Sequence, residues 1–127
     1  CSTSTRCIVE AMKLKCPNAR LLAVTSLGTG DSVRDLNSFY AFVIWFMLWK
    51  VLVDKNTQEQ IIFMQSGWLD WVIVRPGGLT KGETKGVYKV GPYSTGGSIS
   101  RNDVAHFILE NLKAGGELKQ KAVVLTY

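Results

Sequence analysis

Residues 66–80 constrain the fold of this chain more than any other segment. They read Ser-Gly-Trp-Leu-Asp-Trp-Val-Ile-Val-Arg-Pro-Gly-Gly-Leu-Thr, with an aromatic and β-branched run at 71–74. Such a run is typical of a strand that is buried on both faces. Pro76 lacks a backbone donor, and Gly77 and Gly78 allow the backbone to pass close to a ligand. We therefore expect an inner strand that ends abruptly in a functional loop.

The composition is that of one globular domain. The 127 residues are 46% hydrophobic and 20% charged, which is sufficient for a hydrophobic core. The formal net charge is +5, but the basic residues are scattered, so we expect no nucleic-acid partner. Cys1, Cys7 and Cys16 fit no zinc spacing, and His106 is distant in the sequence, so we expect no metal site.

The start of the chain bears on its cellular compartment. The chain begins with Cys1 rather than Met, and its first residues do not resemble a secretory signal. We expect a truncated or processed chain that is not secreted. Three cysteines favour free thiols in a reducing compartment, either the cytoplasm or the stroma or matrix of an organelle.

Hydrophobic spacing and turn residues predict an alternation of helices and strands. Pro17 stops the first helix, and Ser100 caps the last one with Asp103 in its first turn. A polar, glycine-containing loop at 26–32 follows the first strand. The predicted helices are 2–15, 39–65 and 101–113, and the predicted strands are 20–25, 71–74, 87–90 and 122–126.

This alternation predicts an α/β fold, in which helical crossovers join parallel strands. Three core strands are few, because a doubly wound dinucleotide-binding sheet has about six in two halves. No glycine-rich phosphate loop precedes residue 66. We therefore predict a single partial domain over 1–127, the C-terminal half of a doubly wound parallel sheet without its N-terminal phosphate-binding half. The strand at 20–25 then has an exposed flank.

Residues 39–49 are uncharged and rich in aromatic side chains, and the apolar run continues after Lys50 with Val-Leu-Val. A membrane span needs roughly 18 or more apolar residues, so we expect no membrane contact. A buried or interface helix fits better, because a helix that is apolar all round must be covered. The segment from Phe39 to Val53 is therefore a candidate for contact with a protein partner or for self-association.

Four segments carry a resemblance to a known family. They are Leu-Ala-Val-Thr-Ser-Leu-Gly-Thr-Gly-Asp-Ser at 22–32, Asp54-Lys55 with Glu59, the run at 66–80, and Gly-Ser-Ile-Ser-Arg-Asn-Asp-Val-Ala at 97–105. In this order they resemble atypical short-chain dehydrogenase/reductases. The similarity is greatest to the NAD(P)H-binding, NmrA-like branch that includes flavin reductase and biliverdin-IXβ reductase-like proteins.

The resemblance implies a Rossmann-like domain and NADP or NAD as its cofactor. The family's Gly-x-x-Gly-x-x-Gly turn, which seats the pyrophosphate, belongs to the half that we expect to be missing. Dinucleotide binding then requires that this half be supplied. Which of the two nicotinamide cofactors binds is left open.

The resemblance places Thr25 and Ser26 beside the nicotinamide, at the end of the family's fifth strand. A Ser26 hydroxyl there can donate to a developing anion or orient a substrate carbonyl, and we predict it as catalytic. Pro76, Gly77 and Gly78 match a loop whose backbone borders the nicotinamide, and we predict them, with Thr25 and Ser26, as cofactor-binding. The alternatives are that Ser26 serves only its own loop backbone and that residues 76–78 form a plain turn.

Lys55 matches the lysine of the family's Tyr-x-x-x-Lys pair, and we predict it as the second catalytic residue. Val51 stands where the tyrosine would be, so the usual phenolic proton donor is absent. Flavin and biliverdin reductases also lack this tyrosine and take the proton from solvent. The alternative is that Lys55 pairs with Glu59 on the polar face of its helix.

Other conspicuous residues have structural explanations. We expect Arg75 to anchor the loop or a neighbouring carboxylate, Asp103 to cap its helix, and His106 to be partly buried. Trp45, Phe46 and Trp49 either line a site for a flat tetrapyrrole or flavin or, as we prefer, pack as part of a helix.

The sequence thus leaves several functions open. The first is an NAD(P)H-dependent reductase of a small or flat conjugated substrate, represented by its C-terminal half. The second is a non-enzymatic, NmrA-like module that senses dinucleotide or binds a protein partner. The third is a truncated product without function.

Overall fold

Helices and strands alternate at both ends of the chain, but among the described residues between 70 and 100 four strands follow one another. The computed structural model describes residues 1–29, 38–92 and 97–127, without the side chains of 38–45, 47 and 48. The elements are α1 (Ser2–Lys15), β1 (Arg20–Val24), α2 (Ser38–Phe63), β2 (Asp70–Pro76), β3 (Gly78–Thr80), β4 (Lys89–Gly91), β5 (Ser98–Ser100), α3 (Arg101–Glu110) and β6 (Lys121–Thr126).

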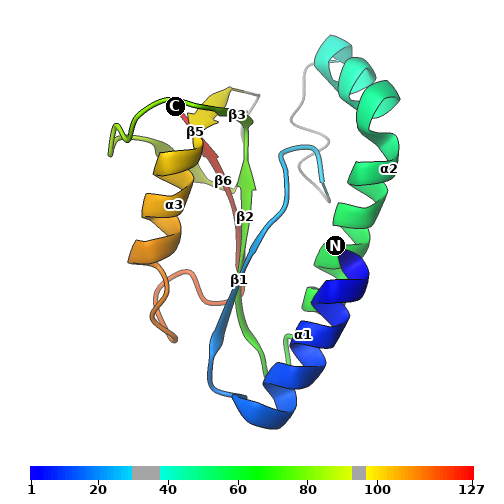
Figure 1. Ribbon diagram of the computed structural model, residues 1–127, viewed down its shortest axis with the longest axis vertical. Coiled ribbons are helices and arrows are strands. Elements are labelled where there is room, and N and C mark those ends of the chain that lie inside the picture. Colours follow the sequence, from blue (N-terminus) through cyan, green and yellow to red (C-terminus); the bar gives the residue numbers. More distant parts are fainter. Residues whose placement is uncertain (30–37, 93–96) are drawn as a thin grey trace.

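The main sheet has the strand order β1-β2-β6-β4. Strand β2 pairs in parallel with β1 and with β6, whereas β4 runs antiparallel to β6. Helices α1 and α2 cover one face of this sheet and α3 covers the other (Figure 1). The α/β prediction and the parallel core strands are therefore confirmed. Among the described strands, β1 lies at the edge of the sheet and pairs on one side only. This agrees with the exposed flank predicted for the strand at 20–25.

Two hydrophobic clusters form the core, one on each face of the sheet. Successive residues of β2 point to opposite faces, so Trp71 and Ile73 join the cluster under α1 and α2 while Val72 and Val74 join the cluster under α3. All seven residues of β2 are buried. This burial on both faces explains why the sequence of β2 lacks a polar alternation.

A second, two-stranded sheet was not predicted from the sequence. It consists of β3 and β5, which pair in parallel over three residues each. Strands this short carry no alternation to detect, and Gly78 begins one of them. The chain turns from β2 into β3 at Gly77, where an added Cβ would lie 2.6 Å from the carbonyl oxygen of Gly97. Gly77 is thus required for the close approach of two backbone segments.

Several boundaries differ from the prediction. Helix α2 ends at Phe63 rather than at residue 65, because the chain enters turns at 64–68. Helix α3 ends at Glu110 rather than at residue 113. There the Asn111 backbone N–H donates to the Phe107 and Ile108 carbonyls, and the Asn111 side chain donates to the Phe107 carbonyl as well.

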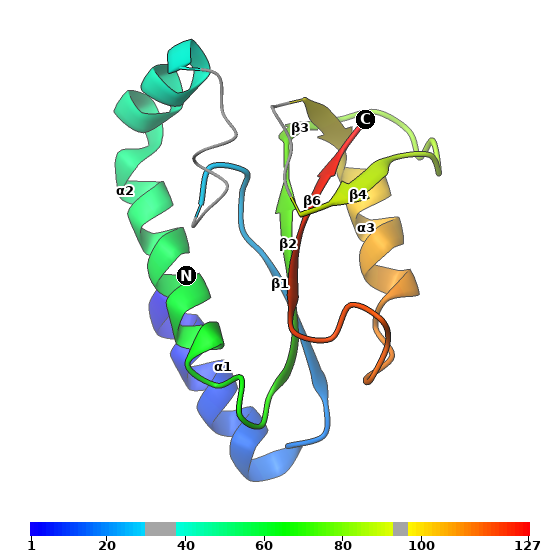
Figure 2. The same cartoon turned by 180° about the vertical axis from the view of Figure 1, so that it is seen from behind.

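The aromatic segment of α2 is less covered than predicted. Phe46 is 76% exposed and Trp49 is 52% exposed, so our preference for helix packing is wrong for these two rings. The amino-terminal turns of α2 extend past the end of the sheet, as the view from behind also shows (Figure 2). The side chains of Phe39 and Trp45 lie outside the described residues. Within the described part of the chain, no helix is long and apolar enough to cross a bilayer.

Candidate functional site

The carboxyl ends of β1 and β2 bring the predicted site residues together. Backbone pairing continues beyond β1, because the Thr25 N–H donates to Val74 O at 2.9 Å and the Leu27 N–H donates to Pro76 O at 3.0 Å. The loop that carries Ser26 therefore runs beside the end of β2. In parallel sheets, ligands bind at this edge, where strands end in loops.

Ser26 lies in this loop and is partly buried. Its hydroxyl donates to the neighbouring Leu27 carbonyl at 3.1 Å. This contact is local and replaceable, so a ligand oxygen that approached the hydroxyl could take over the proton. The local bond and the predicted catalytic role are therefore compatible.

Thr25 has a different environment from its neighbour. Its side chain is buried, and its hydroxyl donates to Glu59 Oε1 at 2.7 Å. The hydroxyl is thus directed into the protein, which leaves only the backbone of Thr25 for the cofactor contact that we predict.

Lys55 reaches the same end of β1 from α2. Its Nζ donates to Val24 O at 3.0 Å and lies 3.4 Å from Gln58 Oε1. The alternative in which Lys55 pairs with Glu59 is wrong, because Glu59 faces inward and pairs with Arg75. Lys55 is one helical turn from Glu59, so both side chains act on the exit of β1.

Pro76, Gly77 and Gly78 follow β2 at the same edge. The Gly77 N–H donates to Leu125 O and the Gly78 N–H donates to Gly97 O, at 3.0 and 2.9 Å. These amides are therefore used within the fold. A cofactor contact at residues 76–78 must rely on carbonyl groups, because the Gly97 carbonyl already fills the space beside Gly77.

A buried ion pair lies beneath the site, and the sequence predicted the role of only one of its two members. Arg75 Nη2 lies 2.8 Å from Glu59 Oε2, and Nε donates to Glu59 Oε1 at 3.1 Å. Glu59 is 1% exposed and Arg75 is 2% exposed. The expectation that Arg75 anchors a carboxylate is confirmed, but the placement of Glu59 on the polar face of the helix is wrong. A lone arginine inside an otherwise apolar strand was the signal for a buried acidic partner.

On the other face, Asp103 organises a second polar cluster. It accepts bonds from the Lys85 and Gly86 amides and from the hydroxyls of Ser100 and Tyr127. Burial opposes its charge, but these bonds, led by that of Tyr127, hold the pKa of Asp103 well below its usual range. The Ser100 hydroxyl in turn accepts from the Asp103 N–H. The structural role predicted for Asp103 is confirmed.

His106 is also tied to this side of the sheet. Its Nδ1 lies 3.0 Å from the Tyr88 hydroxyl and 3.7 Å from Glu110 Oε2, and the ring is partly exposed. Burial, and then the nearby carboxylates of Glu110 and Asp103, raise the pKa of Tyr88. None of these groups lies on the elements that form the β1 and β2 exits. The described residues also hold no cluster of three or more metal-ligating side chains.

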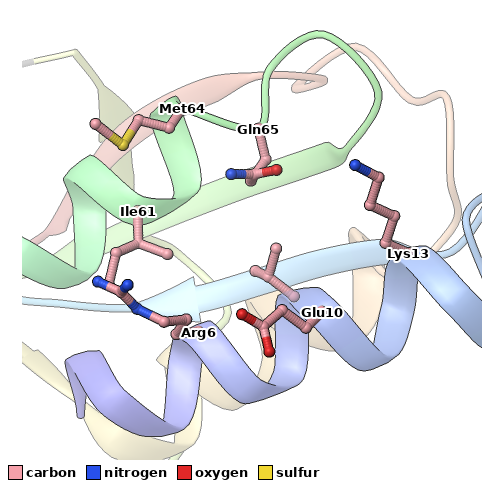
Figure 3. A pocket seen from close by; sticks show the side chains of 7 residues that line it. Arg6, Glu10, Lys13, Ile61, Met64 and Gln65 are labelled. Atoms are coloured by element: carbon pink, nitrogen blue, oxygen red, sulfur yellow. The ribbon is translucent and has the colours of Figure 1, made fainter.

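A separate hollow of about 260 Å³ lies between α1 and the end of α2 (Figure 3). None of the predicted site residues lines it. Its lining residues are Arg6, Val9, Glu10, Lys13, Ile61, Met64 and Gln65. The hollow is therefore distinct from the candidate site.

The model of the NAD(P)H-binding family matches residues 1–114. The chain belongs to this NAD(P)H-binding family. The match covers both strand exits and all of α3, so the Rossmann-like fold and the nicotinamide cofactor expected from the sequence are confirmed. No curated protein matches the chain.

The chain is similar to two solved structures of ChuY. ChuY from Escherichia coli CFT073 is 29% identical with a TM-score of 0.83, over 98% of this chain and 64% of ChuY. ChuY from Escherichia coli O157:H7, an anaerobilin reductase, is also 29% identical with a TM-score of 0.79, over 96% of this chain and 56% of that one. The chain therefore spans less than two thirds of the length of these relatives.

A more distant structure supports the fold alone. A short-chain dehydrogenase/reductase from Veillonella parvula, solved in complex with NADP, is 17% identical with a TM-score of 0.82. The similarity covers 99% of this chain and 58% of that one.

Proposed function

We propose that this chain forms the nicotinamide side of an NAD(P)H-dependent reductase of a small or flat conjugated substrate. The observation that carries the proposal is the meeting of Ser26, the backbone of Thr25 and residues 76–78 at one sheet edge in a chain of the NAD(P)H-binding family. The resemblance to ChuY, an anaerobilin reductase, favours anaerobilin or a similar flat conjugated molecule as the substrate.

In this proposal the cofactor supplies a hydride, and the protein orients the acceptor. Ser26 Oγ donates to the substrate atom that gains electron density, in exchange for its bond to the Leu27 carbonyl. Lys55 holds the end of β1 through Val24 O and adds positive charge near the developing anion. Val51 replaces the family's tyrosine and is exposed, which favours solvent as the proton source.

Nicotinamide fluorescence tests cofactor binding. We would titrate NADPH into this chain and into a longer chain in which the glycine-rich segment of a family member precedes Cys1. Binding by the longer chain supports the proposal, and binding by neither chain contradicts it. Tight binding by the 127-residue chain supports cofactor recognition while contradicting the expectation that the phosphate-binding half is required.

The longer chain also tests the reaction. NADPH oxidation with anaerobilin, or with FMN as a second flat acceptor, distinguishes a reductase from a binding module. NADPH binding without turnover on either acceptor would contradict the reductase and favour the sensing module. The exposed rings of Phe46 and Trp49 support that second candidate, because large exposed apolar groups are typical of contact surfaces.

A reducing compartment, either the cytoplasm or an organelle stroma or matrix, fits the same proposal. Cys1, Cys7 and Cys16 are free and exposed on or next to α1. Exposed thiols persist where glutathione and thioredoxin keep them reduced.

A further inference from the structure

On either side of Ser26, the described part of its loop is bound to one carboxylate oxygen. The hydroxyls of Thr25 and Thr29 each lie 2.7 Å from Glu59 Oε1. Thr29 Oγ1 also lies 2.7 Å from the Ser26 carbonyl, so its single proton is shared between two acceptors. Ser26 thus stands between two residues with the same anchor.

The anchor is itself immobilised from a neighbouring strand. Arg75 on β2 binds both oxygens of Glu59, with Nε on Oε1 and Nη2 on Oε2. Two-point binding by a guanidinium fixes the plane of a carboxylate as well as its position. Because both side chains are almost fully buried, the orientation of Glu59 is determined by the core and not by solvent.

A buried ion pair is a costly way to obtain stability alone. Removing two charges from water offsets most of their attraction, and apolar replacements are often equally stable. This pair also holds two loop hydroxyls, which an apolar pair of the same volume cannot bind. The charge therefore has a use in orienting the loop.

We propose that Glu59 is a positioning residue that holds the Ser26 loop in its reactive orientation, with Arg75 as its support. The inference rests on the proposed function, and it adds the group that sets the direction of the Ser26 hydroxyl. Glu59 acts through Thr25 and Thr29 and does not touch the substrate. Lys55, one turn earlier on α2, completes the hold by its bond to Val24 O.

Thr29 offers the most selective test, because its substitution leaves the ion pair intact. Thr29→Val removes the hydroxyl at nearly constant volume, and Thr29→Ser retains it. Thr57→Val is the matched control, because Thr57 is an exposed residue of α2 whose hydroxyl donates to Val53 O within the same helix.

Amide hydrogen exchange on the 127-residue chain gives the first readout. We expect Thr29→Val to speed exchange at the Leu27 and Thr29 amides about tenfold, since one hydrogen bond contributes roughly that factor to local opening. Thr29→Ser should stay within about threefold of the original chain, and Thr57→Val should leave these amides unchanged. Equal exchange in the Val and Ser variants would overturn the inference.

Turnover in the longer, NADPH-binding chain gives the second readout. A positioning role predicts that Thr29→Val lowers kcat about tenfold with KM for NADPH changed less than threefold, and that Thr29→Ser restores kcat. Faster exchange with unchanged kcat would overturn the inference. If the longer chain binds no NADPH, the proposed function fails, while the exchange comparison still decides whether the Thr29 hydroxyl, which bonds to Glu59 and to the Ser26 carbonyl, holds the loop.

Discussion

Two buried carboxylates hold loops on opposite faces of this sheet, and they are neutralised in different ways. Glu59 has a guanidinium partner, Arg75, and two threonine hydroxyls. Asp103 accepts from two backbone amides and two hydroxyls, and one of these hydroxyls belongs to Tyr127, whose ring centre lies 3.9 Å from Lys85 Nζ.

The difference follows from what each carboxylate must hold. Asp103 holds amides at 85 and 86 and the start of α3, and backbone dipoles are sufficient for that. Glu59 holds two side-chain hydroxyls around Ser26, next to the place where we expect a reaction to develop charge. A fixed ion pair keeps such a site from rearranging as charge appears.

The largest effect is expected from breaking the ion pair on one side. Arg75→Met leaves Glu59 buried without its cation, and we expect a loss of about 3–5 kcal/mol in unfolding free energy. Urea unfolding followed by tryptophan fluorescence measures it. The double variant Arg75→Met with Glu59→Leu should recover much of the loss, because no buried charge remains. A double variant as unstable as the single one would contradict this account.

Low pH tests how much Asp103 contributes to stability. The folded state lowers the pKa of Asp103, so its contribution is present above the ordinary pKa of about 3.9 and is lost as pH falls through the lower native value. Asp103→Asn should therefore lower stability at pH 7 and flatten the decline between pH 5 and 2. Urea midpoints across that range test this, and an unchanged slope would show that other carboxylates control the acid response.

Tyr127→Phe makes a smaller change to the same cluster. It removes the hydroxyl that donates to Asp103 Oδ2 and accepts from the Ser100 N–H. We expect the Ser100 amide to exchange about tenfold faster, while Leu27 near the other carboxylate is unaffected. Faster exchange at both amides would mean that the two clusters are coupled across the sheet.

The sequence predicted the framework well because burial leaves a strong pattern. The β-branched run of β2, the proline after α1 and the Ser100 cap each determine one element locally. Strands β3 and β5 were not predicted, because three residues are too few to show a periodic hydrophobic pattern. Glu59 was not predicted as the partner of Arg75 for another reason. A glutamate one turn from a lysine favours a surface pair, and only the packing of α2 on the sheet turns Glu59 inward.

Ser26→Ala should have the smallest effect on stability of these substitutions. Its effect on activity should be large compared with its effect on stability. The Ser26 hydroxyl donates to the adjacent Leu27 carbonyl, which is a local contact, so Ser26→Ala should change the unfolding free energy by no more than about 0.5 kcal/mol. In the longer, NADPH-binding chain we expect kcat to fall at least tenfold with NADPH affinity retained. An unchanged kcat would assign Ser26 to its loop alone and would leave the Glu59 anchor with a purely structural role, like that of Asp103.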